Sequence, residues 1–361
     1  MKAKEYYQRL KDMHQGDSVD VVIVTALDKE RDAVLRYLDS PQRVETKNRV
    51  VYKSYLQSEN SDSGYQVLVF CLGGMGNNLA SSVVTQAIDV WNPTVIILTG
   101  IMGGVKGSDR LLGDLIVAEQ IVGYELGKLK DVGTERRFEA LRADHLLIEK
   151  ARHFPHHKWA LDQKMISRPD GTSRRVIPQV HFGVVASGEK VIADTITIPE
   201  LQSSWVKLIG IEMESFGTAL AVYQADSAPA MLMVKGICDW ADPNKNDEWQ
   251  EYAAATSAAY VVNFLRSNPI GCRENNRVQP RVTPNFSGKT KIMLCRRLNK
   301  DWKDLADYFD IPEYKRARFS QGYECQAIWE WLQERNQLYR LRDALEFIDR
   351  EDLARWLEEQ F

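Results

Sequence analysis

The sequence predicts an α/β domain whose central sheet is covered by helices on both faces, followed by a small all-α helical bundle. Two observations predict this architecture. Short β-branched or apolar runs alternate with helical stretches through most of the chain, which is typical of a sheet buried on both sides. After a polar segment, apolar residues recur only at helical spacing.

The elements expected in the α/β domain follow from these patterns. Strands are expected at 19–24, 67–70, 95–98, 115–117, 182–185 and 230–234. Helices are expected at 28–38, 80–91 and 247–265. A separate short amphipathic helix is expected at residues 1–16, so the α/β domain itself should span 17–268.

The C-terminal part of the chain differs in composition. Residues 269–286 contain three prolines and little apolar surface, which is typical of a linker. In residues 287–361, leucines and tryptophans recur at intervals of three and four. This part carries no glycine-rich loop and no pairing of nucleophile and base, so we expect a helical domain without catalytic chemistry.

Composition limits the partners and the location of the protein. The net charge of −3 gives no reason to expect nucleic acid as a partner. Five dispersed cysteines without a C-x-x-C pair favour reduced thiols over disulfides or zinc. The polar start of the chain is no signal peptide, and no apolar run is long enough to span a bilayer. We therefore expect a soluble cytoplasmic protein with no metal and no cofactor.

Open α/β sheets bind ligands at the carboxyl ends of their strands. Glu30 lies one helical turn after the first expected strand, Gly74 follows the second, and Gly100 with Ile101 follows the third. Glycines at such ends allow the backbone to approach a ligand closely. Neither glycine run matches a dinucleotide fingerprint or a P-loop, and simple turns explain each run equally well.

Two later segments place acids beside apolar residues. Glu212, Met213 and Glu214 lie on an otherwise apolar segment, and Asp239 with Trp240 follows the last expected strand. Buried acids are costly unless they are paired, and the vicinal hydroxyls of a ribose would supply partners. The alternatives are a helix start on the surface for the first segment and a helix cap for the second.

Taken in order, the motifs A-L-D-K-E, G-G-M-G, T-G-I-M-G-G, G-D-L-I-V, S-G-E-K-V-I, E-M-E-S and C-D-W-A-D resemble the nucleoside phosphorylase/nucleosidase superfamily. They are most similar to methylthioadenosine/S-adenosylhomocysteine nucleosidases, including the version of the domain fused to signalling modules in immune-type proteins. The resemblance covers about Val19 to Leu265. It implies a three-layer α/β/α fold around a mixed sheet, a purine nucleoside or nucleotide as substrate, and a homo-oligomer formed through this domain.

The resemblance also implies a role for individual residues. Glu30 corresponds to the glutamate that activates water, and Asp239 to the acid that protonates the purine at N7. Glu214, beside Met213, corresponds to the acceptor of the ribose hydroxyls. Ile192 corresponds to a residue whose backbone contacts the base. Together these roles predict hydrolysis of an N-glycosidic bond, which needs a base, an acid and a grip on the sugar.

Several positions depart from the family pattern. Leu98 and Ile101 replace an arginine and a serine that bind phosphate in phosphorylases, which favours water as the nucleophile. Lys235 replaces an arginine near the water, keeping the charge but losing the planar fork. Val191 stands where a phenylalanine usually stacks on the purine, and Trp240 is expected to compensate.

The side of the site that faces the 5′ group is expected to carry Trp249. Lys190 and Lys245 are unusual there, and we hypothesise that they contact phosphates, so that the substrate is a nucleotide such as ATP or AMP. Ordinary solvated lysines are the alternative. Arg136 and Arg137 are read as loop charges rather than phosphate ligands.

Residues 285–361 resemble a bacterial effector-associated, death-fold-like domain, through phrases such as D-W-K-D-L-A and L-R-D-A-L. This resemblance implies recruitment of another protein that bears a matching domain, and a role as an effector in antiviral defense. The alternatives for the whole chain are a purine nucleoside phosphorylase, a salvage nucleosidase and a catalytically silent scaffold that senses a nucleotide. Retention of Glu30, Glu214 and Asp239 favours the hydrolase.

Overall fold

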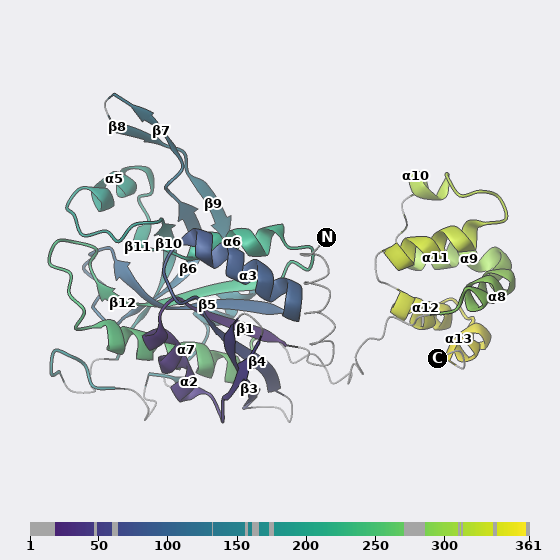
Figure 1. Cartoon of the computed structure of the whole chain (residues 1–361), viewed down its shortest axis with the longest axis horizontal. Helices are drawn as coiled ribbons and strands as arrows, with labels where there is room; N and C mark the ends of the chain where they lie inside the picture. The colour runs from purple at the N-terminus through teal and green to yellow at the C-terminus, as the bar shows by residue number, and fades with distance from the viewer. Residues whose placement is uncertain are drawn as a thin grey trace. The chain divides into compact units, whose positions relative to one another are not determined.

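The computed structural model describes residues 19–46, 49–59, 64–131, 133–155, 158–160, 166–172, 177–270, 286–309, 311, 313–334 and 338–358. The chain divides into two compact units, residues 1–275 and residues 276–361 (Figure 1). The helix expected at 1–16 and most of the expected linker lie outside the described residues.

A mixed sheet of ten described strands forms the centre of the first unit. Its order is β11-β10-β6-β12-β5-β1-β4-β3-β2, with β9 paired to β6. The strands are β1 (Val21–Thr25), β2 (Gln42–Glu45), β3 (Val50–Gln57), β4 (Gly64–Cys71), β5 (Val95–Gly104), β6 (Leu115–Gly123), β9 (Glu139–Arg142), β10 (Val180–Ser187), β11 (Leu208–Glu212) and β12 (Ala230–Asp239). Because β12 runs parallel to β5 and antiparallel to β6, the predicted mixed sheet is confirmed.

Both faces of the sheet are buried, because successive residues of a strand point to opposite faces. Val21 and Ile23 of β1 join one hydrophobic cluster, and Val22 and Val24 join the other. The first cluster includes residues of α2 (Asp28–Tyr37), α4 (His145–Arg152) and α7 (Gln250–Arg266). The second includes residues of α3 (Asn77–Trp91) and α6 (Ser215–Gln224), on the opposite face in Figure 1. The predicted three-layer fold is therefore confirmed.

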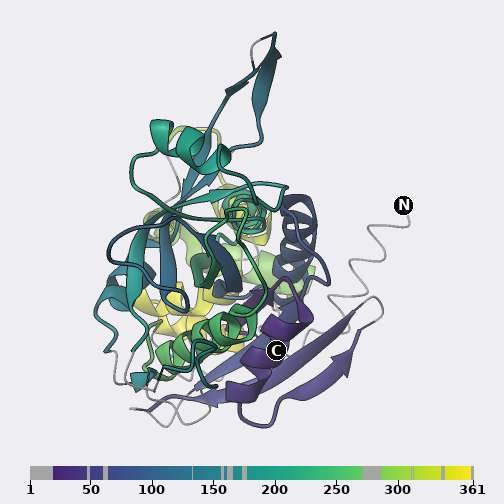
Figure 2. The same ribbon diagram turned by 90° about the vertical axis from the view of Figure 1, so that its left-hand side faces the viewer.

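Several elements of the first unit had no clear signal in the sequence. These are the strands β2, β3, β9 and β11, together with α4, α5 (Thr197–Ser204) and a hairpin of β7 (Gly127–Lys130) and β8 (Gly133–Arg136). The hairpin projects from the body of its unit in Figures 1 and 2, and every residue of β7 is exposed. Polar, exposed strands of this kind lack the apolar alternation by which strands are predicted.

The second unit is the predicted helical bundle. Its helices are α8 (Gly288–Leu298), α9 (Trp302–Tyr308), α10 (Glu313–Arg316), α11 (Glu324–Glu334), α12 (Leu341–Phe347) and α13 (Glu351–Glu358), with short 3₁₀ turns at Asn299–Asp301 and Leu338–Arg340. Leucines from α8, α9, α11, α12 and α13 form one buried core. Neither unit contains, within its described part, a helix of the length and hydropathy that a membrane span requires.

Asn77, the first residue of α3, ties three segments together near the carboxyl ends of the strands. Its Oδ1 accepts hydrogen bonds from Gly217 N (2.8 Å) and Ser187 Oγ (2.9 Å), and its Nδ2 donates to Gly188 O (3.0 Å). The end of β10 and the starts of α3 and α6 are thereby fixed relative to one another. A Cβ atom at Gly217 would lie 2.0 Å from Asn77 O, so only glycine permits this approach.

We expect Gly217→Ala to lower the free energy of unfolding by about 1–3 kcal/mol, because the added methyl group forces α3 and α6 apart. Chemical denaturation measures this change. Tyr223→Ala, at a 75% exposed position of the same helix, is the control and should change stability by less than about 0.5 kcal/mol. Equal stability of Gly217→Ala and the wild type would contradict the close approach of the two helices.

Candidate active site

A cavity of about 120 Å³ lies at the carboxyl ends of β1, β5, β11 and β12. Ten of the residues predicted from the sequence line it: Glu30, Ile101, Lys190, Val191, Ile192, Glu212, Met213, Glu214, Asp239 and Lys245. The three acids to which roles were assigned, distant in sequence, therefore share one cavity. Their individual roles stay predictions.

Glu30 is anchored by backbone donors from two strand ends. Its Oε2 accepts from Ala26 N (2.7 Å) and Leu27 N (2.8 Å), and its Oε1 accepts from Ile101 N (2.8 Å). A carboxylate has about four acceptor positions, so one remains for a water or ligand. Burial raises the pKa of Glu30, and the charge of Lys235 and the three N–H groups offset part of that rise.

Gly100 makes room for this carboxylate. Its φ of +151° and its place within β5, next to Ile101, bring the backbone against Glu30, and a Cβ atom there would lie 2.1 Å from Glu30 Oε1. Gly103, three positions further along β5, is similarly close to Asp239, whose Oδ1 would lie 3.2 Å from an ideal Cβ at Gly103. Gly100 thus belongs to the site through Glu30 and does not itself line the cavity.

Lys235 forms a buried ionic cluster with two of the acids. Its Nζ donates to Glu212 Oε2 (2.9 Å) and Glu214 Oε2 (2.6 Å), and its side chain is 1% exposed. Burial alone would lower the pKa of Lys235, but the carboxylates of Glu212, Glu214 and Glu30 outweigh burial and raise it. Lys235 is therefore charged, and it lies behind the cavity wall rather than in it.

The two acids of the cluster differ in their remaining contacts. Glu212 also accepts from Glu214 N, Ser215 N and Ser215 Oγ, so its oxygens are occupied. Glu212 lines the cavity, but these contacts hold Lys235 and the start of α6, so its predicted role in substrate binding stays a prediction. Glu214 accepts only from Gly76 N (3.2 Å) and Lys235 among the described residues, which leaves acceptor positions for a ligand.

The pKa values of the two glutamates shift in opposite directions. Burial tends to raise both, but Lys235 and the hydrogen bonds from Ser215 and Glu214 N lower the pKa of Glu212 below its usual range. Burial and the nearby Glu212 charge raise the pKa of Glu214 despite the same lysine. Protons consequently bind Glu214 before they bind Glu212.

Asp239 lies at the end of β12, where a bulge between Ile237 and Asp239 shifts the pairing with β5. The bulge lets both Cys238 and Asp239 line the cavity. Asp239 Oδ1 accepts from Ala241 N (2.8 Å), and Lys245 Nζ lies 3.6 Å from Oδ2. Lys245 is therefore the ion-pair partner of Asp239. Lys190 pairs instead with Glu125, and its Nζ lies 2.5 Å from Glu125 Oε2.

Besides Gly100 and Lys235, three predicted residues do not reach the cavity: Gly74, Trp240 and Trp249. Trp240 points away from it because it follows Asp239 directly and packs against Gly104 and the core beneath α3 and α6. Trp249 is buried with Cys238 and Tyr252, with the Arg168 guanidinium 4.9 Å from its ring. Gly74 is replaced in the lining by its neighbour Met75.

Nine lining residues were not predicted: Ala26, Leu27, Met75, Met102, Gly103, Ile211, Cys238, Ala241 and Gln250. Most of these nine residues are sequence neighbours of a predicted residue. The motifs that contain the predicted residues were therefore the signal that could have identified them. Gln250 follows the predicted Trp249, but nothing in the sequence favoured Gln250 over that residue, and its partner Lys29 is remote in sequence. Within the described residues, no group of histidines, cysteines and acids is arranged to hold a metal.

We expect Lys235→Met to lower the free energy of unfolding by about 3–5 kcal/mol, because two buried carboxylates lose their counter-charge. Denaturation at neutral pH measures the loss. Lys207→Met removes an exposed lysine and should cost less than about 0.5 kcal/mol. A Lys235→Met protein as stable as the control would show that the cluster contributes nothing to folding.

Comparisons with known proteins find relatives of the first unit among nucleosidases. The chain is 25% identical over 261 residues to the ATP nucleosidase Cap17 of Escherichia coli (strain KTE188), covering 68% of this chain and 51% of that protein. It is 25% identical over 254 residues to the 5′-methylthioadenosine/S-adenosylhomocysteine nucleosidase of an Exiguobacterium species, covering 67% of this chain and 95% of that protein. The chain spans about half the length of Cap17 and of another relative, from Sinorhizobium fredii.

The fold has solved counterparts. The structure of the 5′-methylthioadenosine/S-adenosylhomocysteine nucleosidase from S. pneumoniae matches with a TM-score of 0.54 at 18% identity, covering 69% of this chain and 99% of that chain. The model of the family described as Bacterial Death-like domain 3 matches residues 288–360. The model described as Phosphorylase superfamily matches residues 20–266. By this match, and in agreement with the resemblance in its motifs, the chain belongs to the phosphorylase superfamily.

Proposed function

We propose that this chain hydrolyses the N-glycosidic bond of an adenine nucleoside or nucleotide and releases the free base. The observation that carries the proposal is the meeting of Glu30, Glu214 and Asp239 in one cavity, where each carboxylate is held by at least one backbone N–H. The similarity to Cap17 and to methylthioadenosine/S-adenosylhomocysteine nucleosidases supports adenine as the base.

Each acid has contacts suited to one step of the reaction. Glu30, held by three N–H donors, keeps one acceptor position with which to take a proton from water. Glu214 accepts the ribose hydroxyls through its unoccupied lone pairs, and Lys235 fixes its orientation. Asp239 donates a proton to N7 as the bond to C1′ breaks, and Lys245 stabilises the carboxylate that remains.

Water rather than phosphate is the nucleophile in this proposal. Leu98 is fully buried in the hydrophobic core, and the backbone N–H of Ile101 is already bonded to Glu30. Neither position supplies a donor for inorganic phosphate. Base release that depends on added phosphate would instead indicate phosphorolysis.

The bundle extends the proposal to regulation. Its match to Bacterial Death-like domain 3 supports recruitment through a matching domain on another protein. A role in antiviral defense, a homo-oligomer and a cytoplasmic location stay predictions from the sequence.

We expect Asp239→Asn to lower turnover by about 100- to 10,000-fold, because the amide cannot protonate the leaving base. Adenine released from adenosine, AMP and ATP is measured by chromatography with mass spectrometry. Asp242→Asn is the matched control, since Asp242 belongs to the same motif but pairs with Lys106 at 2.7 Å and does not line the cavity. Equal activity of the two variants would refute the assignment of Asp239.

The pH profile tests Glu30. A base must be ionised, and burial raises the pKa of Glu30, so the acid limb of kcat/KM should lie above the pH at which an exposed glutamate ionises. Lys235→Met should move the limb to still higher pH, because the lysine charge lowers the pKa of Glu30. Lys235→Arg keeps that charge and should leave the limb near its wild-type position. An acid limb unmoved by Lys235→Met would exclude Glu30 as the ionising group.

A further inference from the structure

A second cavity, of about 370 Å³, adjoins the one that holds the three acids. Lys190 and Ile192, on the segment that follows β10, line both cavities. The far wall of the second cavity is formed by Tyr124 and by Arg136, the last residue of β8 at the base of the projecting hairpin.

The side chains of this second cavity include two cations from different parts of the fold. Arg136 lies over the Tyr124 ring at 5.4 Å, which orients its guanidinium. Arg136 donates two hydrogen bonds to described residues, and both are long. They go to Tyr124 O at 3.3 Å and to Glu200 Oε2 at 3.4 Å. Most of its five N–H donors are therefore available to a better acceptor.

Lys190 stands at the boundary between the cavities. Its side chain is 69% exposed, and its Nζ contacts Glu125 Oε2. Glu125 is the acid within the second cavity and is also held by Glu189 N at 3.1 Å. Lys190 can exchange its contact with Glu125 for one with an incoming anion. Glu125 then still accepts a hydrogen bond from the Glu189 N–H.

We propose that the second cavity is the subsite for the 5′-phosphates of the substrate, which makes a nucleoside polyphosphate the preferred substrate class. The inference rests on the proposed function, because the first cavity must hold the nucleoside. A phosphate chain leaving the sugar passes Lys190 at the boundary and ends at Arg136, whose planar fork binds phosphate through two parallel hydrogen bonds. Arg136, which the sequence analysis interpreted as a loop charge, is thus a ligand of the substrate in this proposal.

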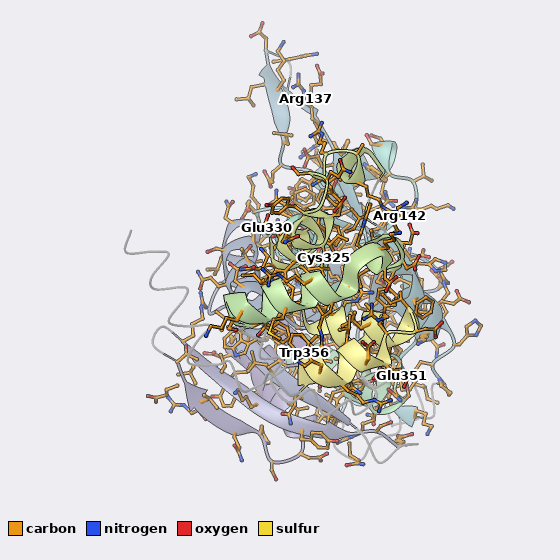
Figure 3. The ribbon with its side chains drawn as sticks, turned by 90° about the vertical axis from the view of Figure 1, so that its right-hand side faces the viewer. Arg137, Arg142, Cys325, Glu330, Glu351 and Trp356 are labelled. Atoms are coloured by element: carbon orange, nitrogen blue, oxygen red, sulfur yellow. The ribbon has the colours of Figure 1, made fainter. Side chains whose placement is uncertain are left out.

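The test compares kcat/KM for adenosine, AMP, ADP and ATP with the full-length protein. ADP and ATP should exceed adenosine, and Arg136→Ala should lower the ratio of ATP to adenosine cleavage roughly tenfold or more, the usual effect of losing a charged hydrogen bond. Arg137→Ala is the matched control. Arg137 is the next residue, is exposed beside the hairpin (Figure 3), does not line the cavity, and should leave the ratio unchanged.

Two results would overturn the subsite. One is adenosine cleaved as efficiently as ATP; the other is equal ATP-to-adenosine ratios for Arg136→Ala and the wild type. If no compound releases its base, the proposed function fails, and calorimetric binding of ATP then tests the subsite by itself. Weaker ATP binding by Arg136→Ala than by Arg137→Ala would support the subsite, and equal binding by variants with the same melting temperature would refute it.

Discussion

The ionic cluster around Lys235 is the interaction on which the candidate site depends. It joins β12 to the turn between β11 and α6 and, through Glu214 and Gly76 N, to the start of α3. Burying a cation is costly, and only the two carboxylates make its position favourable. The same contacts orient Glu214 and lower the pKa of Glu212, so folding and site geometry share one set of bonds.

The cluster also sets the charge of the cavity. Glu30, Glu212 and Glu214 carry three negative charges when ionised, and Lys235 offsets one of them. The balance among these four buried groups is negative, which suits a reaction whose sugar becomes positively charged as the base departs. Buried charges that need no rearrangement during the reaction are the most effective form of such stabilisation.

Apolar periodicity predicted the main strands and a sheet covered on both faces, because it is a local signal. The three-layer fold and the common site of the three acids were implied by the family resemblance of the motifs. The sequence did not predict side-chain direction at the ends of elements. Cys238 reaches the cavity because of a bulge in β12. Trp249 was expected to line the cavity, but the next residue, Gln250, lines it instead. Such differences of one residue depend on tertiary pairing, which no pattern in a single sequence encodes. Arg136 could not be assigned either, since its role depends on where an exposed hairpin folds back.

Glu30 has a consequence for how this domain can change over generations. As the third residue of α2, it accepts from the N–H of Leu27 at the helix start and from Ile101 on a neighbouring strand. Selection for an intact helix would preserve a carboxylate at this position even in descendants that no longer turn over substrate. Asp239 makes a single backbone hydrogen bond, which asparagine could also accept. Inactive descendants are therefore expected to diverge first at position 239, and that position is the better marker of catalysis.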